Sequence, residues 1–168
     1  TDNPVNRCYY CKQGVFGTIL EAAKNDGMTV ILEGTNASDD ADDRPGMKAL
    51  QEMKVLSPLR MCGYVKSEIR KQSKEAGLFV YNKPSYACLA TRIPTGTEID
   101  EEKIKQVETA ETFLFDLGFS DFRVRWMDNK AKIQMPESQL QALMEKREVV
   151  LEELSKIFDE VLLDLRTR

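Results

Sequence analysis

The segment of residues 83–94 constrains this chain more than any other stretch, because it places one cysteine between two proline-containing turns. Cys88 has Lys-Pro-Ser upstream of it and Thr-Arg-Ile-Pro downstream. Far earlier in the chain, Cys8 and Cys11 form a Cys-x-x-Cys motif. This motif is typical of zinc sites, iron–sulfur clusters and redox pairs. We expect the fold to bring these three sulfur atoms to one site, where sulfur or iron–sulfur chemistry takes place.

The fourth cysteine, Cys62, bears on the choice between these sites. A closed zinc site needs a fourth ligand, and Cys62 is the remaining thiol in a chain without histidine. Its place beside Gly63, at the start of a predicted helix, favours a small buried apolar residue. Three thiolates fit a 4Fe–4S cluster in which one iron lacks a protein thiolate and can bind an external ligand. A redox pair would open a helix after a strand, whereas a turn at residues 3–7 precedes this motif.

Composition excludes several classes of protein. The chain has 168 residues, 42% hydrophobic and 31% charged, as expected for a globular protein with one core or two small lobes. Its net charge of −4 argues against a nucleic-acid surface, which needs clustered Lys and Arg. The sequence contains no apolar run near the roughly 20 residues of a membrane span, and we expect no signal peptide. We therefore expect a cytoplasmic protein that binds neither nucleic acid nor membrane.

Residues 1–95 carry the pattern of a parallel α/β sheet. A helix is predicted over residues 15–26, with Gly27 as its stop. Residues 28–32 form a continuous apolar run, typical of a strand buried on both faces. A helix followed by such a strand is half of a right-handed βαβ unit. A second strand is predicted over residues 55–59, and helices over residues 47–53 and 63–76.

The turn after the first predicted strand is a candidate binding site. Ligands of open α/β sheets bind beyond the carboxyl ends of the strands, which places Gly34, Thr35 and Asn36 near a ligand. An acidic run follows this turn, and it forms either a solvated loop or a contact for magnesium; its members are Asp39, Asp40, Asp42 and Asp43.

Residues 96–168 predict a separate α+β lobe with the order α-β-β-α-β, after a boundary near residues 95–98. Asp100 is the expected N-cap of a helix that runs to Leu117 and ends at Gly118. A β-hairpin over residues 122–135, a helix over 137–158 and a strand over 160–165 follow. Glu111 lies on the apolar stripe of the first helix, so its carboxylate is either at an interface edge or held by a cation.

Two arginines on the predicted hairpin form a candidate anion site. Arg123 and Arg125 are two residues apart on one strand, so their side chains share a face. Two guanidinium groups on rigid backbone make a clamp for phosphate or carboxylate. The alternative is a solvated strand face, paired in part with Glu111. Lys83 and Arg92 flank Cys88 and add positive charge that would attract an anionic substrate.

These motifs together resemble the LarE family, the ATP-dependent sacrificial sulfur transferases of the PP-loop ATP pyrophosphatase superfamily. The resemblance runs in order through nearly the whole chain. It rests on Asn3-Pro4, Arg7-Cys8-Tyr9 with Cys11-Lys12, Gly34-Thr35-Asn36-Ala37 with Asp39, Asp40 and Arg44-Pro45-Gly46, Ser57-Pro58-Leu59, Lys66 with Glu68-Ile69-Arg70, the segment of residues 83–94, and Arg123-Val124-Arg125.

The resemblance implies a reaction. LarE enzymes adenylate a carboxylate of pyridinium-3,5-biscarboxylic acid mononucleotide with ATP and Mg²⁺, then replace the activated oxygen by sulfur. The product leads to the nickel-pincer cofactor of lactate racemase. In single-cysteine members the counterpart of Cys88 gives up its own sulfur and becomes dehydroalanine. Three-cysteine members resemble this chain, and they hold a 4Fe–4S cluster and pass sulfide from its open iron, which is the route we favour.

The same resemblance assigns roles to residues and domains. It makes Cys88 the sulfur-transfer residue, with Cys8, Cys11 and Cys88 as cluster ligands. The positions that match a substrate-phosphate site are Thr91, Glu111, Arg123 and Arg125. Residues 1–95 correspond to the C-terminal part of a PP-loop (adenine nucleotide α-hydrolase-like) domain, and residues 96–168 to a substrate-binding or oligomerisation domain.

This sequence departs from the family pattern in several places. The Ser-Gly-Gly-x-Asp-Ser loop that binds ATP pyrophosphate is absent, Gln134 stands where the family more often has Glu, and Thr91 where it often has Ser. We therefore expect a fragment or one half of a split enzyme, which associates with the missing half or with copies of itself. The alternatives are a PP-loop tRNA thiolase, which needs a basic RNA path, and a non-catalytic four-cysteine zinc module.

Overall fold

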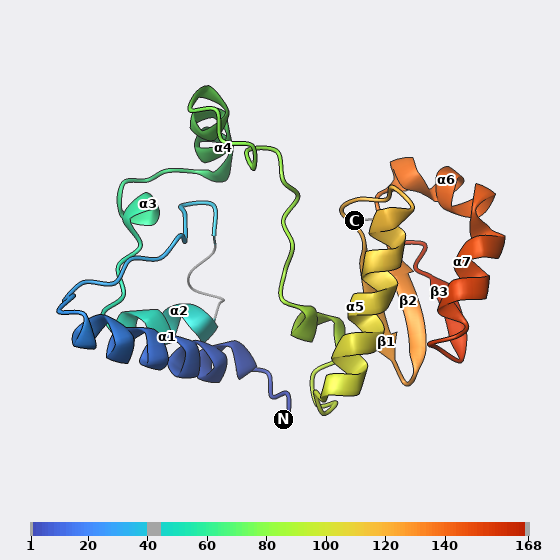
Figure 1. Cartoon of the computed structure of the whole chain (residues 1–168), viewed down its shortest axis with the longest axis horizontal. Helices are drawn as coiled ribbons and strands as arrows, with labels where there is room; N and C mark the ends of the chain where they lie inside the picture. The colour runs from blue at the N-terminus through green and yellow to red at the C-terminus, as the bar shows by residue number, and fades with distance from the viewer. Residues whose placement is uncertain (1, 40–44, 167–168) are drawn as a thin grey trace. The chain divides into compact units, whose positions relative to one another are not determined.

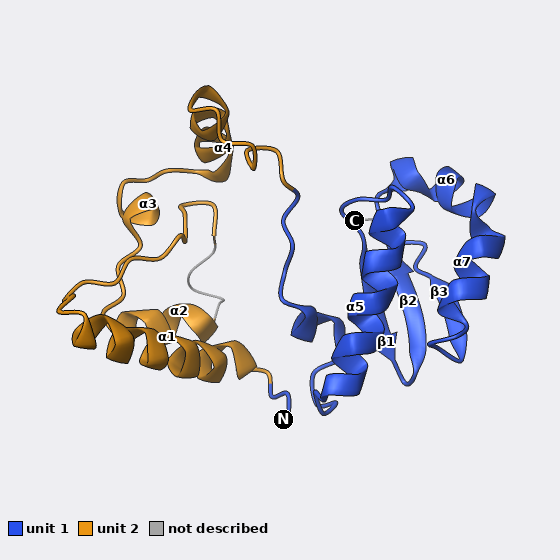
Figure 2. Cartoon of the chain, viewed as in Figure 1, with its two compact units in different colours: residues 1–4, 84–168 blue, residues 5–83 orange. Residues whose placement is uncertain are grey.

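The chain forms two compact units in the computed structural model, which describes residues 2–39 and 45–166 (Figure 1). Unit 1 contains residues 1–4 and 84–168, and unit 2 contains residues 5–83 (Figure 2). The division falls at residue 84 and not near residue 95, so the Cys88 segment shares a unit with the C-terminal lobe. Asn3 also joins unit 1, because its amide donates to the Pro94 carbonyl at 2.7 Å and its carbonyl accepts from Gly96 N–H. The predicted α/β class is confirmed.

A three-stranded mixed sheet forms the frame of unit 1. Strands β1 (Arg123–Met127) and β2 (Lys130–Gln134) make an antiparallel hairpin, and β3 (Glu160–Leu163) pairs with β2 in parallel. The hairpin turn contains Asp128 and Asn129, which both have positive φ (49° and 58°), as a two-residue type I′ turn requires. Strand β1 is one edge of the sheet and β3 is the other.

Helix α5 (Glu101–Asp116) forms as the sequence predicts. The Asp100 carboxylate caps it by accepting from Lys103 N–H at 2.8 Å, and Gly118 (φ 93°) follows its end. The single helix predicted over residues 137–158 is wrong. The chain forms instead a 3₁₀ turn, η2 (Glu137–Gln139), and the helices α6 (Leu140–Glu145) and α7 (Arg147–Leu154). Between α6 and α7, the Lys146 amine donates to the carbonyl of Leu117, the C-cap residue of α5.

The core of unit 1 lies between one face of the sheet and helices α5, α6 and α7 (Figure 1). Its buried members are Ala110, Leu114, Phe119, Phe122, Val124, Ala131, Ile133, Met135, Leu143, Val150, Leu154 and Phe158. Because successive strand residues face opposite sides, Val124 points into this core while Arg123 and Arg125 lie on the other face. The break between α6 and α7 lets Leu143 and Leu154 reach the same core.

Unit 2 is mainly helical over its described residues. It contains α1 (Arg7–Asn25), α2 (Pro45–Glu52), α3 (Pro58–Met61) and α4 (Lys66–Glu75). A small core joins Met47, Leu50 and Val55 to Phe16 and Ile31. Helix α1 begins at Arg7 and not near residue 15, so the Cys-x-x-Cys motif lies within its first turns and not in a preceding loop.

The two strands predicted in unit 2 are reduced to one parallel bridge, between Leu32 and Leu56. Leu56 N–H donates to Ile31 O at 3.0 Å, and Glu33 N–H donates to Leu56 O at 2.9 Å. The run at residues 28–32 is not buried on both faces as predicted, because Met28, Val30 and Leu32 are 57–64% exposed. No helix in the described stretches is long and apolar enough to cross a membrane.

We predict that Leu154→Ala lowers the free energy of unfolding of unit 1 by about 2–5 kcal/mol, because it leaves a cavity at a fully buried position. Leu151→Ala, on the same helix but 46% exposed, is the matched control and should cost less than about 1 kcal/mol. Urea unfolding followed by fluorescence of the single tryptophan, Trp126, measures both. Equal effects of the two substitutions would contradict this placement of the core.

Candidate functional site

The structure divides the predicted cysteine site between the two units. Cys8 and Cys11 lie on α1 in unit 2, whereas Cys88 lies in unit 1, and all of these thiols are exposed. The grouping of the three sulfurs at one site stays a prediction. Cys62 was predicted as a buried apolar residue, and this is wrong, because it is exposed at the C-cap of α3.

Cys8 and Cys11 lie close together on helix α1. They are three residues apart on a helix, so their side chains project from neighbouring positions on one face. Thiolates at such positions suit zinc or an iron–sulfur cluster. Within the described part of the chain, neither unit gathers three His, Cys, Asp or Glu side chains in a metal-binding arrangement.

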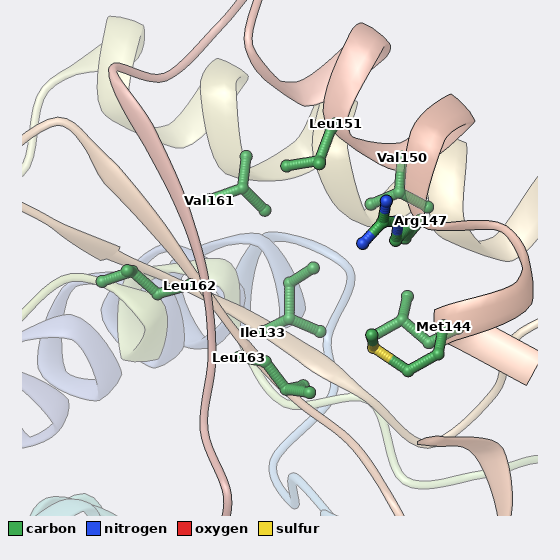
Figure 3. A pocket seen from close by; sticks show the side chains of 9 residues that line it. Ile133, Met144, Arg147, Val150, Leu151, Val161, Leu162 and Leu163 are labelled. Carbon is green, nitrogen blue, oxygen red and sulfur yellow. The ribbon is translucent and has the colours of Figure 1, made fainter. Parts of the chain in front are cut away.

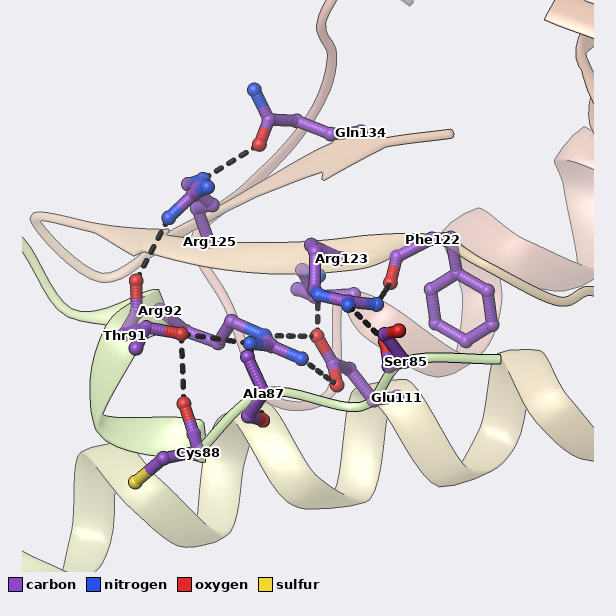
Figure 4. A network of polar contacts seen from close by, with 11 residues as sticks. Ser85, Ala87, Cys88, Thr91, Arg92, Glu111, Phe122, Arg123, Arg125 and Gln134 are labelled. Carbon is purple, nitrogen blue, oxygen red and sulfur yellow. Dashed lines mark hydrogen bonds and ion pairs between the residues drawn. The ribbon is translucent and has the colours of Figure 1, made fainter. Parts of the chain in front are cut away.

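The Cys88 segment turns sharply at the cysteine. Cys88 is the N-cap of the 3₁₀ helix η1 (Leu89–Arg92), and its carbonyl accepts from Thr91 N–H at 2.9 Å. The Thr91 hydroxyl donates to the same carbonyl at 2.7 Å. Figure 4 shows the Cys88 sulfur pointing away from the polar network behind it. The backbone of this residue is therefore held while its thiol is open to a reactant.

A buried ion pair lies behind the segment. Arg92 and Glu111 are each 1% exposed or less, and they meet in two contacts, Nε–Oε1 at 2.7 Å and Nη2–Oε2 at 3.0 Å. Glu111 Oε1 also accepts from Val124 N–H at 2.8 Å. That N–H belongs to β1, an edge strand of the sheet, and Glu111 supplies its acceptor. Of the two alternatives for Glu111, the cation is confirmed, and the cation is Arg92.

The sequence predicts Arg92 only as a positive charge beside Cys88, whereas the structure buries it in an ion pair with Glu111. The signal that could have located it is Glu111, since a carboxylate on the apolar stripe of a helix needs a buried cation.

Arg123 and Arg125 share the outer face of the sheet, as predicted, and both hold the backbone of the Cys88 segment (Figure 4). Arg123 is buried and donates to Ser85 O at 2.6 Å and to Phe122 O at 2.5 Å. Arg125 donates to Thr91 O at 2.8 Å and to Gln134 Oε1 at 2.6 Å. The pair donates to protein carbonyls and is not a solvated strand face. It anchors the segment on both sides of Cys88.

The charge around the segment is positive, since three guanidinium groups contact its residues and the Glu111 carboxylate pairs with one of them, that of Arg92. The Tyr86 ring completes the cluster, with its centroid 5.3 Å from Arg92 Cζ and 5.8 Å from Arg123 Cζ. The pKa of Tyr86 is raised to about 12, first by partial burial and then by the hydrogen bond to Glu111 and the negative charge of that carboxylate. The positive charges of Arg92 and Arg123 act in the opposite direction. Tyr86 therefore stays a neutral phenol at physiological pH, and the cluster can attract anions.

The turn at Gly34, Thr35 and Asn36 lies in unit 2 and is closed by carboxylates. Thr35 donates to Glu33 Oε2 through its N–H at 3.0 Å and its hydroxyl at 2.6 Å. Asn36 donates to Asp39 through its side-chain amide at 3.0 Å. Asp40, Asp42 and Asp43, of the predicted cation contact, lie outside the described residues. The nucleotide contact of this turn stays a prediction.

A groove of about 250 Å³ opens elsewhere in unit 1, between β3 and helices α6 and α7 (Figure 3). Its lining is apolar apart from Arg147 and consists of Ile133, Leu143, Met144, Val150, Leu151, Val161, Leu162 and Leu163. None of the predicted site residues lines it, so the candidate site is the Cys88 segment with its arginines.

Comparison with known proteins links the chain to a synthase. It is 33% identical over 139 residues, 83% of its length, to the pyridinium-3,5-bisthiocarboxylic acid mononucleotide synthase of Lactiplantibacillus plantarum. It is 39% identical over 94% of its length to an uncharacterized protein of Synechocystis, and 31% identical over 88% to one of Methanocaldococcus jannaschii. The chain spans 50–58% of the length of these relatives. No protein-family model matches it.

We predict that Glu111→Ala destabilises unit 1 by about 3–5 kcal/mol, because it leaves the Arg92 charge buried without a partner. The double variant Arg92→Met/Glu111→Leu should recover most of this loss, since it removes both charges and fills their volume. Urea unfolding followed by Trp126 fluorescence compares the two. If the double variant is as unstable as Glu111→Ala, the unpaired charge of Arg92 is not the cause of the destabilisation.

Proposed function

We propose that this chain is part of an ATP-dependent sulfur transferase of the LarE type. It converts carboxylates of pyridinium-3,5-biscarboxylic acid mononucleotide to thiocarboxylates, in the synthesis of a nickel-pincer cofactor. The observation that carries the proposal is the 33% identity to a bisthiocarboxylic acid mononucleotide synthase. That match of 139 residues is longer than either unit, so it extends over both. An exposed cysteine on a cationic scaffold, as at Cys88, suits an anionic mononucleotide.

Cys88 is the proposed sulfur-transfer residue. Its thiolate attacks the acyl carbon of the adenylated carboxylate, and AMP departs with the electrons of the broken C–O bond, which gives a thioester. Loss of the Cys88 α-proton then breaks the Cβ–Sγ bond. The sulfur remains on the product as a thiocarboxylate, and residue 88 becomes dehydroalanine. The exposed thiol, turned away from its anchoring contacts, supports this role.

Sulfide delivery is the second proposed route, with Cys8, Cys11 and Cys88 as ligands of a 4Fe–4S cluster. The donor set fits such a group, because all three thiols are exposed and two share one face of α1. When bound, the cluster supplies an iron without a protein thiolate, which can carry sulfide. Iron, sulfide and zinc analysis after anaerobic purification separates this cluster from a zinc site.

ATP and Mg²⁺ are the proposed co-substrates, with Gly34, Thr35 and Asn36 near the nucleotide. The chain lacks the Ser-Gly-Gly-x-Asp-Ser loop, so we propose that a further polypeptide segment supplies the pyrophosphate site, or that copies of the chain associate. The exposed apolar run at residues 28–32 supports such a partner, because it has the composition of a buried strand and pairs through a single bridge.

The substrate phosphate is proposed to bind at Arg123 and Arg125, beside Thr91 and Glu111. In the structure both guanidinium groups donate to carbonyls of the Cys88 segment. A phosphate bound there must therefore share or replace these contacts. Phosphate is the stronger acceptor because it is charged, so this exchange favours binding.

We predict that Cys88→Ser abolishes thiocarboxylate formation, whereas Cys62→Ser, which removes another exposed thiol, leaves it unchanged. The reaction offers the acyl-adenylate of the mononucleotide directly, so that it does not depend on the ATP loop. Mass spectrometry of the small molecule detects sulfur in the product.

The mass of the chain after the reaction separates the two sulfur sources. Loss of the mass of H₂S from the parent chain indicates transfer of the Cys88 sulfur, and an unchanged chain indicates delivered sulfide. Product formation by Cys88→Ser at the parental rate would contradict the proposed role of this residue.

We predict that Arg125→Ala weakens binding of the mononucleotide by about tenfold or more, the usual effect of losing a charge-assisted hydrogen bond. Lys130→Ala removes the same charge from the same face of the sheet and is the matched control, with a change of about twofold or less. Isothermal titration calorimetry at fixed ionic strength measures both. Equal weakening by the two variants would indicate general charge attraction and not a clamp.

A further inference from the structure

Arg92 is linked to the carbonyls on both sides of the Cys88 α-carbon, directly to that of Ala87 and through Thr91 to that of Cys88. Its Nη1 donates to Ala87 O at 3.4 Å and to the Thr91 hydroxyl at 2.8 Å (Figure 4). The Thr91 hydroxyl in turn donates to Cys88 O at 2.7 Å. The carbonyls before and after the Cys88 α-carbon are therefore both tied, directly or through Thr91, to one guanidinium group.

The chemistry of these groups fixes the direction of each hydrogen bond. A guanidinium group has donors and no acceptor, so the Thr91 oxygen must accept from Arg92. The hydroxyl has a single proton, which is then left for Cys88 O. Arg92 thus selects the rotamer and the proton direction of Thr91 that hold the turn at Cys88.

Arg92 itself has a fixed position. Glu111 holds it through two contacts, and Glu111 is attached to the edge of β1 through Val124 N–H. Rigid strand and helix backbone is thereby connected to the Cys88 turn through one buried pair. A buried ion pair contributes little to stability compared with apolar residues of similar volume, so its physical value here is the geometry that it imposes.

We infer that Arg92 is a positioning residue that acts through Thr91 to hold the backbone of Cys88, with Glu111 fixing Arg92 in turn. The inference deepens the proposed function and rests on it, since it assumes that Cys88 is the residue that reacts. The thiol itself stays unrestrained by this network and exposed.

Amide hydrogen exchange tests the network without any substrate. Thr91 N–H is bonded to Cys88 O, so its exchange reports opening of the turn directly. Thr91→Val should speed amide exchange at residue 91 about fivefold relative to the β1–β2 amides, because one hydrogen bond of the turn is lost. The exchange rates are first corrected for the intrinsic rate of each residue type. Thr91→Ser, which keeps the hydroxyl, should restore the parental ratio. Arg92→Lys should behave as Thr91→Val does.

The control is Leu154→Ala, which destabilises unit 1 without touching the segment, and which should raise exchange at the turn and in the β1–β2 ladder together. An unchanged ratio in Thr91→Val and Arg92→Lys would overturn the inference. The same holds if Thr91→Ser behaves as Thr91→Val does, because the hydroxyl would then have no part in the effect.

A second readout compares two reactions of the Cys88 thiol, in a background with Cys8, Cys11 and Cys62 replaced by Ser. Alkylation by iodoacetamide needs no particular orientation, whereas attack on the bound acyl-adenylate does. Thr91→Val should slow acyl transfer severalfold and leave alkylation unchanged, and equal slowing of both would overturn the inference. If the parent protein transfers no acyl group, the proposed function fails while the exchange result still decides the network.

Discussion

The buried carboxylate of Glu111 is the interaction on which the candidate site depends. It satisfies three donors at once, two from Arg92 and the outward N–H of Val124 at the edge of β1. Each of these groups would be costly to bury alone. Their combination gives an acceptor to one N–H of the edge strand and holds a guanidinium group against Ala87 and Thr91, on both sides of Cys88. A single glutamate on an otherwise apolar helix stripe therefore joins the fold of unit 1 to its candidate chemistry.

The three arginines of the site differ in what they can do. Arg92 donates to Glu111, Thr91 and Ala87 and is fully buried, so it is suited to structure and not to ligand binding. Arg123 and Arg125 donate to neutral carbonyls, which a charged acceptor can displace. The sequence pattern alone treats all three as equal sources of positive charge. Their hydrogen-bond partners separate them into one anchor, paired with a carboxylate, and two contacts to carbonyls.

Much of unit 1 could be predicted from the sequence because local signals and tertiary packing agree there. The Asp100 cap and Gly118 bound α5, and the Asp128–Asn129 turn fixes the hairpin register that puts Arg123 and Arg125 on one face. The strands predicted in unit 2 did not form as expected, and the reason is physical. The run at residues 28–32 has strand composition, but a strand needs neighbours, and here it has a single bridge to Leu56. The start of α1 was missed because residues 3–7 were assigned to the Asn-Pro turn, and the N-cap, Asn6, makes no side-chain capping hydrogen bond.

The anchoring contacts also bear on how substrate and sulfur could be coordinated. The Cys88 segment is fixed at Ser85 and Thr91 by the same two guanidinium groups that are proposed to hold the substrate phosphate. Any acceptor that takes these donors weakens the outer anchors of the segment and leaves the inner one, through Arg92, in place. Binding energy of the phosphate can thereby be used to adjust the segment around a fixed pivot next to Cys88. Such coupling lets the remote end of a substrate influence the position of the reacting sulfur.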